Sequence, residues 1–266
     1  MDSSFASVNA AFSKQAAHYD ADDIANPILQ QWRHSVYRHV ENFLKPGSRI
    51  LELNPGTGID ALHFIRQGHS VLGVELSQGM VHQLENKIEQ FNLKGRLQIH
   101  HGSFENLNEI DGKFDYVFSN FGGLNCCHDL HQVTRHLSDK LQPNAFVTWV
   151  IMPPFCPWEI MWAFKGHFKQ AFRRFHPHGV MAHLEGEYFK TYYYSLADVK
   201  KALGANFKLV ACEGLGVFSP PPSASMFSIR YPKMFQKLVA LDLTLKKHLP
   251  FNRIGDHLVI TTQFHG

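Results

Sequence analysis

Short apolar runs alternate with segments of helical periodicity through the first 150 residues of the chain. The strand-like runs are Arg49–Asn54, Ser70–Glu75, Leu97–Gly102, Phe114–Ser119 and Ala145–Met152. Between them, apolar positions recur at helical spacing over Ile59–Gln67, Gly79–Gln90 and Asp129–Leu141. Repeated strand–helix units of this kind predict an α/β fold with a mostly parallel sheet and helices on both faces.

The two ends of the chain extend this pattern. Residues 1–45 are mostly helical in character and lead to Pro46-Gly47, a sequence that ends helices. We therefore expect a helical cap over residues 1–45 and a main domain over residues 46–266. Leu258–Phe264 has the character of a last strand that returns after a long excursion.

Two insertions interrupt the alternation. Residues 153–194 begin at Pro153-Pro154 and are rich in aromatic side chains, and residues 217–255 open with three prolines and contain a helical pattern at Lys233–Lys247. Both follow the carboxyl ends of expected strands, where open α/β sheets bind ligands. We expect them, together with the N-terminal helices, to roof a substrate pocket, with Trp158, Trp162 and Tyr192 against the substrate.

Composition narrows the class of protein. The chain has 266 residues, 44% of them hydrophobic, which suits one globular α/β unit. A net charge of +3 makes no case for nucleic-acid binding. No apolar stretch is long enough to span a membrane and the N-terminus has no secretory character, so a cytoplasmic location is expected. Four cysteines and 18 histidines show no metal or disulfide spacing, so neither is expected.

The most informative segment is Arg49–Gly58, with the sequence RILELNPGTG. An apolar strand carrying Glu52 enters a turn that contains Gly56 and Gly58, and a helical pattern follows at once. Strand, glycine turn and helix form the arrangement that lets backbone N–H groups approach a nucleotide-like ligand.

An acid at the end of the next strand supports this interpretation. Glu75 ends the run Val71–Glu75, where a carboxylate can accept hydrogen bonds from both ribose hydroxyls. NAD is one possible ligand, because Gly56–Ala61 fits the pattern G-x-G-x-x-A. The negative charge of Glu52 and the lack of Arg or Lys in the turn favour a cationic ligand over a pyrophosphate.

Here the chain resembles the class I S-adenosylmethionine-dependent methyltransferases, over roughly residues 45 to 150. Glu52-Leu53-Asn54-Pro55-Gly56-Thr57-Gly58 is similar to their first motif, with Asn54 in place of its first glycine. Further similar segments are Val74–Met80, Gly102-Ser103-Phe104 and Phe114–Phe121. The resemblance implies a Rossmann-like sheet of seven strands in the order 3-2-1-4-5-7-6, the last strand antiparallel.

The resemblance also implies roles for individual residues in binding S-adenosylmethionine, with S-adenosylhomocysteine as product. Glu52 would orient the methionine amine, Gly56 and Gly58 would admit the cofactor, and Glu75 would hold the ribose. The remaining cofactor-binding residues that it implies are Tyr19, Arg33, Asn54, Leu76, Met80, Ser103, Phe104, Asn120 and Phe121. Among them, Tyr19 belongs to an N-terminal Tyr-Asp pair, and Arg33 would bind a carboxylate of cofactor or substrate.

The expected reaction is in-line transfer of a methyl group to a small, partly apolar acceptor, with O-methylation favoured and N- and C-methylation open. A general base is needed only if the acceptor carries a proton of high pKa, and His18 and His128 are the candidates. Two alternatives remain: a regulatory protein that binds the cofactor without turnover, and an NAD-dependent oxidoreductase.

Overall fold

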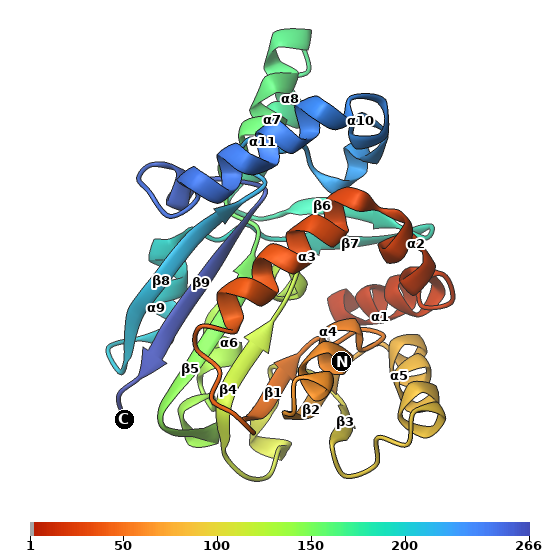
Figure 1. Ribbon diagram of the computed structural model, residues 1–266, viewed down its shortest axis with the longest axis vertical. Coiled ribbons are helices and arrows are strands. Elements are labelled where there is room, and N and C mark those ends of the chain that lie inside the picture. The colour runs from red at the N-terminus through yellow and green to blue at the C-terminus, as the bar shows by residue number, and fades with distance from the viewer. Residues whose placement is uncertain (1–2) are drawn as a thin grey trace.

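The computed structural model describes residues 3–266, which form a central sheet with helices on both faces (Figure 1). The strands of the large sheet are β1 (Arg49–Leu53), β2 (Ser70–Glu75), β3 (Leu97–His101), β4 (Phe114–Ser119), β5 (Leu141–Ile151), β8 (Phe207–Leu215) and β9 (His257–Phe264). The helices are α1 (Ser3–Gln15), α2 (Tyr19–Ala25), α3 (Pro27–Val40), α4 (Ile59–Arg66), α5 (Gln78–Gln90), α6 (Leu130–Thr134), α7 (Pro157–Ile160), α8 (Phe168–Ala171), α9 (Leu196–Leu203), α10 (Ser225–Arg230) and α11 (Pro232–Leu245).

The sheet has seven strands in the order β3-β2-β1-β4-β5-β9-β8. Strands β1 to β5 pair in parallel, whereas β9 runs antiparallel to both β5 and β8. In strand order this is the expected 3-2-1-4-5-7-6 arrangement, so the fold expected from the sequence is confirmed.

Two apolar layers cover the sheet. On one face Trp32 of α3, Phe64 of α4 and Leu84 of α5 pack with Tyr116 and Phe118 of β4. On the other face the apolar side chains of α6 and α9 pack with β4, β5 and β9. Strands that are buried on both faces are typical of parallel sheets, which explains why their sequences are almost continuously apolar.

The helix expected over Asp129–Leu141 is much shorter in the structure. Asp129 caps the N-terminus of α6 by accepting from the His131 N–H at 3.0 Å, and α6 ends at Thr134. A 3-10 turn over Ser138–Lys140 follows, because Leu141 already pairs with Phe114 at the start of β5. Pairing with a distant strand therefore overrides the local helical periodicity.

Residues 153–194 contain a β-hairpin that the helical and aromatic interpretation missed. Strands β6 (Val180–Leu184) and β7 (Glu187–Thr191) are joined by Glu185 and Gly186, whose φ angles are +50° and +79°. Two central residues with positive φ form the turn that suits the twist of a two-stranded hairpin. The hairpin packs against α1, with Phe189 and Phe12 5.9 Å apart between ring centroids.

Within residues 3–266, no helix is both long and apolar enough to cross a membrane. The four cysteines are all buried and unpaired, as the sequence indicated.

Candidate functional site

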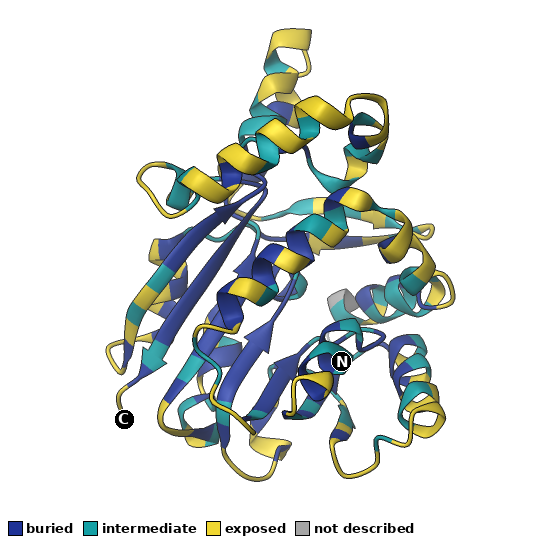
Figure 2. Ribbon diagram, in the orientation of Figure 1, coloured by how far each residue is buried: buried dark blue, intermediate teal, exposed yellow. Residues whose placement is uncertain are grey.

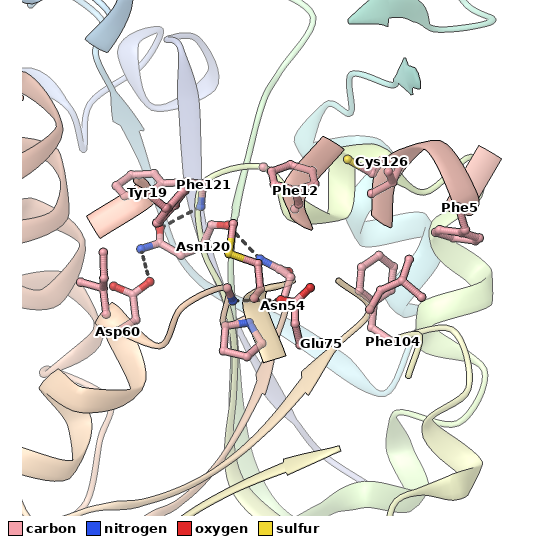
Figure 3. Close-up of a pocket in the computed structure, with 18 of the residues that line it drawn as sticks. Phe5, Phe12, Tyr19, Asn54, Asp60, Glu75, Phe104, Asn120, Phe121 and Cys126 are labelled. Atoms are coloured by element: carbon pink, nitrogen blue, oxygen red, sulfur yellow. Dashed lines mark hydrogen bonds between the residues drawn. The ribbon is translucent and has the colours of Figure 1, made fainter. Parts of the chain in front are cut away.

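A cavity lies at the carboxyl ends of β1, β2 and β4, beneath helices α1 and α2 (Figure 3). Its floor comes from the glycine turn after β1 and from the residues that follow β2 and β4. Its roof is aromatic, with Phe5 and Phe12 from α1, Tyr19 from α2 and Phe121 from the loop after β4. This is the edge where the sequence placed the ligand.

Asn54 holds the turn in shape in place of a glycine. Its φ of +58° is left-handed, a conformation that asparagine tolerates better than most residues. Its side-chain oxygen accepts from the Ser119 hydroxyl at 2.7 Å, and its amide nitrogen donates to the Asn120 carbonyl at 3.2 Å. Asn54 therefore ties the β1 turn to the end of β4 as well as supplying the backbone torsion.

A side chain would meet different surroundings at the two glycines of the turn, Gly56 and Gly58. A Cβ on Gly56 would extend toward Met80 with its sulfur 3.9 Å away, inside the cavity lining. A Cβ on Gly58 would lie 2.1 Å from a methyl of Leu84, so the buried Leu84 side chain of α5 would have to move. Gly58 does not line the cavity, which corrects the expectation that it admits the ligand directly.

Both carboxylate oxygens of Glu75 accept backbone hydrogen bonds. One accepts from the Gly56 N–H at 2.9 Å and the other from the Ser77 N–H at 2.8 Å. Burial raises the pKa of Glu75, and these two N–H groups oppose the rise. Each oxygen keeps a lone pair that can accept from a ligand hydroxyl, and Glu75 lines the cavity.

Glu52 is a buried carboxyl group with an unused oxygen. The side chain is buried within β1, and its Oε2 atom has no hydrogen-bond partner among the described residues. Burial, together with nearby Asp60 and Glu75, raises its pKa well above the ordinary value. Glu52 is not among the residues that line the cavity. An acceptor of this kind is suited to a cationic ligand group that would restore its charge.

Arg33 is held in a buried network of charges. Its guanidinium forms ion pairs with Asp23 of α2 and Asp60 of α4 and lies 4.9 Å from the Phe121 ring centroid. Its Nε atom is buried without a hydrogen-bond partner among the described residues, and Arg33 lines the cavity. The Arg33 Nε–H group is therefore available to a ligand carboxylate, as expected from the sequence. The other guanidinium nitrogens bind Asp23 and Asp60 and so join α2, α3 and α4.

The Tyr-Asp pair at the start of α2 closes on the glycine turn. Asp20 accepts from the Thr57 hydroxyl at 2.5 Å and pairs with Lys87 of α5, also at 2.5 Å. Its neighbour Tyr19 is buried in the roof, and burial raises its pKa to about 12. The cap is thus fastened to the turn, with Tyr19 kept neutral above the cavity.

Most of the other expected cofactor residues also meet in the cavity. Its lining includes Leu76, Met80, Phe104, Asn120 and Phe121. Ser103 does not line it, because its hydroxyl accepts from the Glu105 N–H at 3.1 Å in a local turn.

Neither histidine expected as a base lies in the cavity. His18 is half-exposed at the start of α2 and lies 3.3 Å from a carboxylate oxygen of Glu185. His128 is exposed and packs edge-on against Tyr192, with 5.1 Å between ring centroids. Among the described residues that line the cavity there is no histidine.

The three aromatic residues expected to contact substrate also lie outside the lining. Trp158 donates from its indole N–H to the Phe218 carbonyl at 3.1 Å, and Trp162 is partly exposed beside Lys165. Tyr192 packs under the hairpin, where its backbone N–H donates to the Asn125 carbonyl. The short helices α7 and α8 point away from the cavity, so of the expected roof only the N-terminal helices α1 and α2 cover it (Figure 1).

Nine cavity residues were missed from the sequence, among them Phe5, Phe12, Asp60 and Cys126. The first two lie on one side of α1, whose apolar spacing could have identified them. Asp60 lies in the first turn of α4. Acids are common in the first turn of helices, so the sequence did not indicate that this one is buried and lines the cavity.

One cluster resembles a metal site by composition. Cys156, Glu159 and Asp256 bring their ligand atoms within 4.8 Å of one another. Arg174 is buried against them and pairs with both carboxylates, and Arg173 also binds Glu159. Both carboxylates are therefore already paired with arginine side chains, and the ion pairs hold the segment around Arg174 in place. We assign no metal to this cluster.

Comparison with known proteins agrees with this geometry. Residues 50–144 match the family model described as a methyltransferase domain. The match covers the glycine turn, Glu75 and the end of β4, which together form the cavity floor. This similarity identifies residues 50–144 as a methyltransferase domain.

Two curated relatives match part of the chain. The chain is 28% identical over 145 residues to a demethylmenaquinone methyltransferase of Lactobacillus johnsonii. It is 33% identical over 116 residues to an uncharacterized methyltransferase of Schizosaccharomyces pombe. These matches cover 53% and 40% of this chain, and 58% and 40% of the relatives, so the chain spans about half the length of the relatives that it matches.

A solved structure matches nearly the whole chain. An S-adenosylmethionine-dependent methyltransferase from Clostridium acetobutylicum superimposes with a TM-score of 0.60 at 16% identity, over 95% of this chain and 98% of that one. At this identity the likeness concerns the fold, and it extends the methyltransferase fold to the cap and the insertions.

Proposed function

We propose that this protein transfers a methyl group from S-adenosylmethionine to a small, partly apolar acceptor and does not act on nucleic acid. The observation that carries the proposal is the buried Glu52 carboxyl with an unpartnered oxygen, directly before a glycine turn and beside Glu75. A cationic ligand with a ribose suits this pair, whereas a pyrophosphate would be repelled by it.

The residues present fit the cofactor. Glu52 would bind the ammonium group of the methionine part of the cofactor, and the Arg33 Nε–H would donate to its carboxylate. Glu75 would accept from the ribose hydroxyls with its free lone pairs. Leu76, Met80 and Phe104 supply an apolar slot beside Glu75 for the adenine. We retain residues 1–45 as a proposed cap and residues 46–266 as the proposed catalytic domain.

When bound, S-adenosylmethionine supplies an electrophilic methyl group, so the protein needs to bind, orient and exclude water. The aromatic roof of Phe12, Tyr19 and Phe121 provides the water-poor surface. Asn120 and Phe121, at the end of β4, face the space that the acceptor would occupy. The apolar lining agrees with an apolar acceptor, as in the relative named as a demethylmenaquinone methyltransferase.

We propose O-methylation of a group that is already ionised at neutral pH, such as a carboxylate. The lining holds no histidine among the described residues, and burial raises the pKa of the Cys126 thiol to about 12. An acceptor that needs no base suits such a lining. We therefore expect His18→Ala and His128→Ala to retain full turnover, and a large loss in either variant would restore that histidine as the base.

Calorimetric titration with S-adenosylmethionine, S-adenosylhomocysteine and NAD, on the native protein and on Glu75→Gln, tests the proposal. We expect binding of the first two ligands, weakened about tenfold or more in the variant because charged hydrogen bonds are lost. Binding of NAD alone would indicate an oxidoreductase instead. Cofactor binding with no methyl transfer to carboxylate, phenol, amine or carbon acceptors would indicate a regulatory protein.

A further inference from the structure

A second feature of the molecule lies far from the cavity. The segments 157–175 and 225–249 carry large apolar side chains that face solvent, and we call them together the outer surface. Phe164 is 89% exposed, Met226 68% and Phe168 62%. Figure 2 shows the exposed residues of α8, α10 and α11 gathered at the upper end of the molecule. Contiguous exposed apolar surface of this kind marks an interaction site.

The two segments form one surface because they pack on each other. The Trp158 ring of α7 lies edge-on to Phe227 of α10, with 6.2 Å between ring centroids. The Trp158 indole also donates to the Phe218 carbonyl, which leads into the second segment. Figure 1 shows α7, α8, α10 and α11 together above the carboxyl end of the sheet.

The charge of this surface has one sign. The only acid of the first segment is Glu159, which is largely buried and pairs with Arg173 and Arg174, and the sequence from Met161 to Leu184 contains no Asp or Glu. The only acid from Gly214 to Gly255 is Asp242. Asp242 is buried and accepts from the Phe218 and Ser219 N–H groups, so it adds no exposed negative charge. Among the described residues of the two segments, the exposed cations without an ion pair are Lys165, Lys169, Arg230, Lys233 and Lys237, whereas exposed Arg173 and Lys247 pair with Glu159 and Glu213.

These cations are available to a partner. Within residues 3–266 none of the five forms an ion pair. Instead Lys165 lies 5.0 Å from the Trp162 ring centroid, and Arg230 lies 5.5 Å from that of Tyr231. At both places a charged group and an aromatic ring lie side by side on the surface, so apolar and cationic groups face solvent together.

We propose that the outer surface binds the face of a bilayer that contains anionic lipids. Aromatic and aliphatic side chains enter the region between headgroups and acyl chains, and Lys and Arg contact lipid phosphates, which is the chemistry of interfacial binding. A second copy of this chain fits less well, since self-association would bring like charges together. The proposal does not depend on methyl transfer in the cavity.

Vesicle flotation tests the proposal with the full-length protein. The vesicles are phosphatidylcholine alone, or phosphatidylcholine with about one third phosphatidylglycerol, at low and high salt. We expect flotation with the anionic vesicles only, weakened at high salt because the attraction is screened. Trp162 fluorescence is expected to shift to the blue on binding. No flotation with anionic vesicles, or equal flotation with both kinds, would overturn the proposal.

Paired variants locate the surface. Lys165→Glu with Lys169→Glu is expected to weaken binding by about twentyfold or more, from the usual contribution of a basic residue near an anionic bilayer. Lys200→Glu with Lys201→Glu, on exposed positions of α9, is the control with the same charge change and is expected to bind nearly as the native protein does. Equal losses in both pairs would show a general charge effect and overturn the assignment.

The apolar part is tested in the same way. Phe164→Ser with Phe168→Ser is expected to lose flotation, whereas Phe91→Ser, at an exposed position after α5, is expected to keep it. Circular dichroism shows that each variant folds. If the native protein forms a dimer that the Phe164/Phe168 variant cannot form, and does not float, the surface serves a second copy and the lipid proposal is wrong.

Discussion

The Asn120 side-chain amide donates to the Asp60 carboxylate at 2.9 Å, which joins the end of β4 to the first turn of α4. The same carboxylate accepts from the Tyr37 hydroxyl at 2.6 Å and pairs with Arg33. One buried acid therefore connects the end of β4 with α3 and α4. Burial without bulk water makes each of these contacts costly to lose.

Asp60→Ala is expected to lower the free energy of unfolding by about 3 kcal/mol, because it leaves the buried Arg33 with only Asp23 as a charged partner. Asp60→Asn keeps the shape and is expected to cost less. Urea unfolding measures both. Glu85→Ala, at an exposed position of α5, is the control and should stay within about 0.5 kcal/mol of the native protein. A similar small effect for Asp60→Ala would show that the network is not stabilising.

Glu52→Gln is expected to stabilise the ligand-free protein and to weaken cofactor binding. Burial raises the pKa of Glu52, so folding favours its protonated form. This contribution is fully present below the ordinary carboxyl pKa and is lost as pH rises through the raised value. The gain in Tm from Glu52→Gln should therefore be larger at pH 9 than at pH 5. A gain that does not change with pH would contradict the buried-acid interpretation.

The two glycines of the turn are expected to respond differently to alanine. Gly56→Ala costs about 1–2 kcal/mol of stability from its left-handed torsion and narrows the cofactor site. Gly58→Ala has a similar torsional cost plus the clash with Leu84, about 1–3 kcal/mol more. Leu84→Ala in the second variant should recover part of that clash, as measured by thermal unfolding. If the folded Gly58→Ala protein loses cofactor affinity as strongly as Gly56→Ala, then Gly58 contacts the ligand after all.

Acid stability is expected to depend on Glu213. Burial opposes its ionisation, but His39 at 2.9 Å and Lys246 at 2.6 Å lower its pKa to about 2. A lowered carboxyl pKa contributes stability that is present above the unfolded value and lost as pH falls toward 2. Glu213→Gln should therefore remove a contribution of about 3 kcal/mol at neutral pH and flatten the acid limb of the stability profile. An unchanged acid limb would show that the ion pairs contribute nothing.

Local pattern was sufficient for much of the site. The strand, turn and helix of Arg49–Gly58 and the acid at Glu75 are contiguous in sequence, and their geometry follows from short-range torsions and periodicity. The positive φ of Asn54 could also be expected, because asparagine is among the few residues that tolerate it. The order of the strands followed from the family resemblance and the right-handed connection of parallel strands.

What the sequence by itself determined is therefore the sheet, the glycine turn and the acid at Glu75 that lines the cavity, because each depends on neighbours within a few residues. Only the tertiary structure decided that Phe5 and Phe12 roof the cavity while Trp162 faces solvent. It also decided that Gly58 serves helix packing and that Asp60 joins three elements. These are contacts between segments distant in the chain, and side-chain type does not specify which of several buried or exposed surroundings a residue will meet.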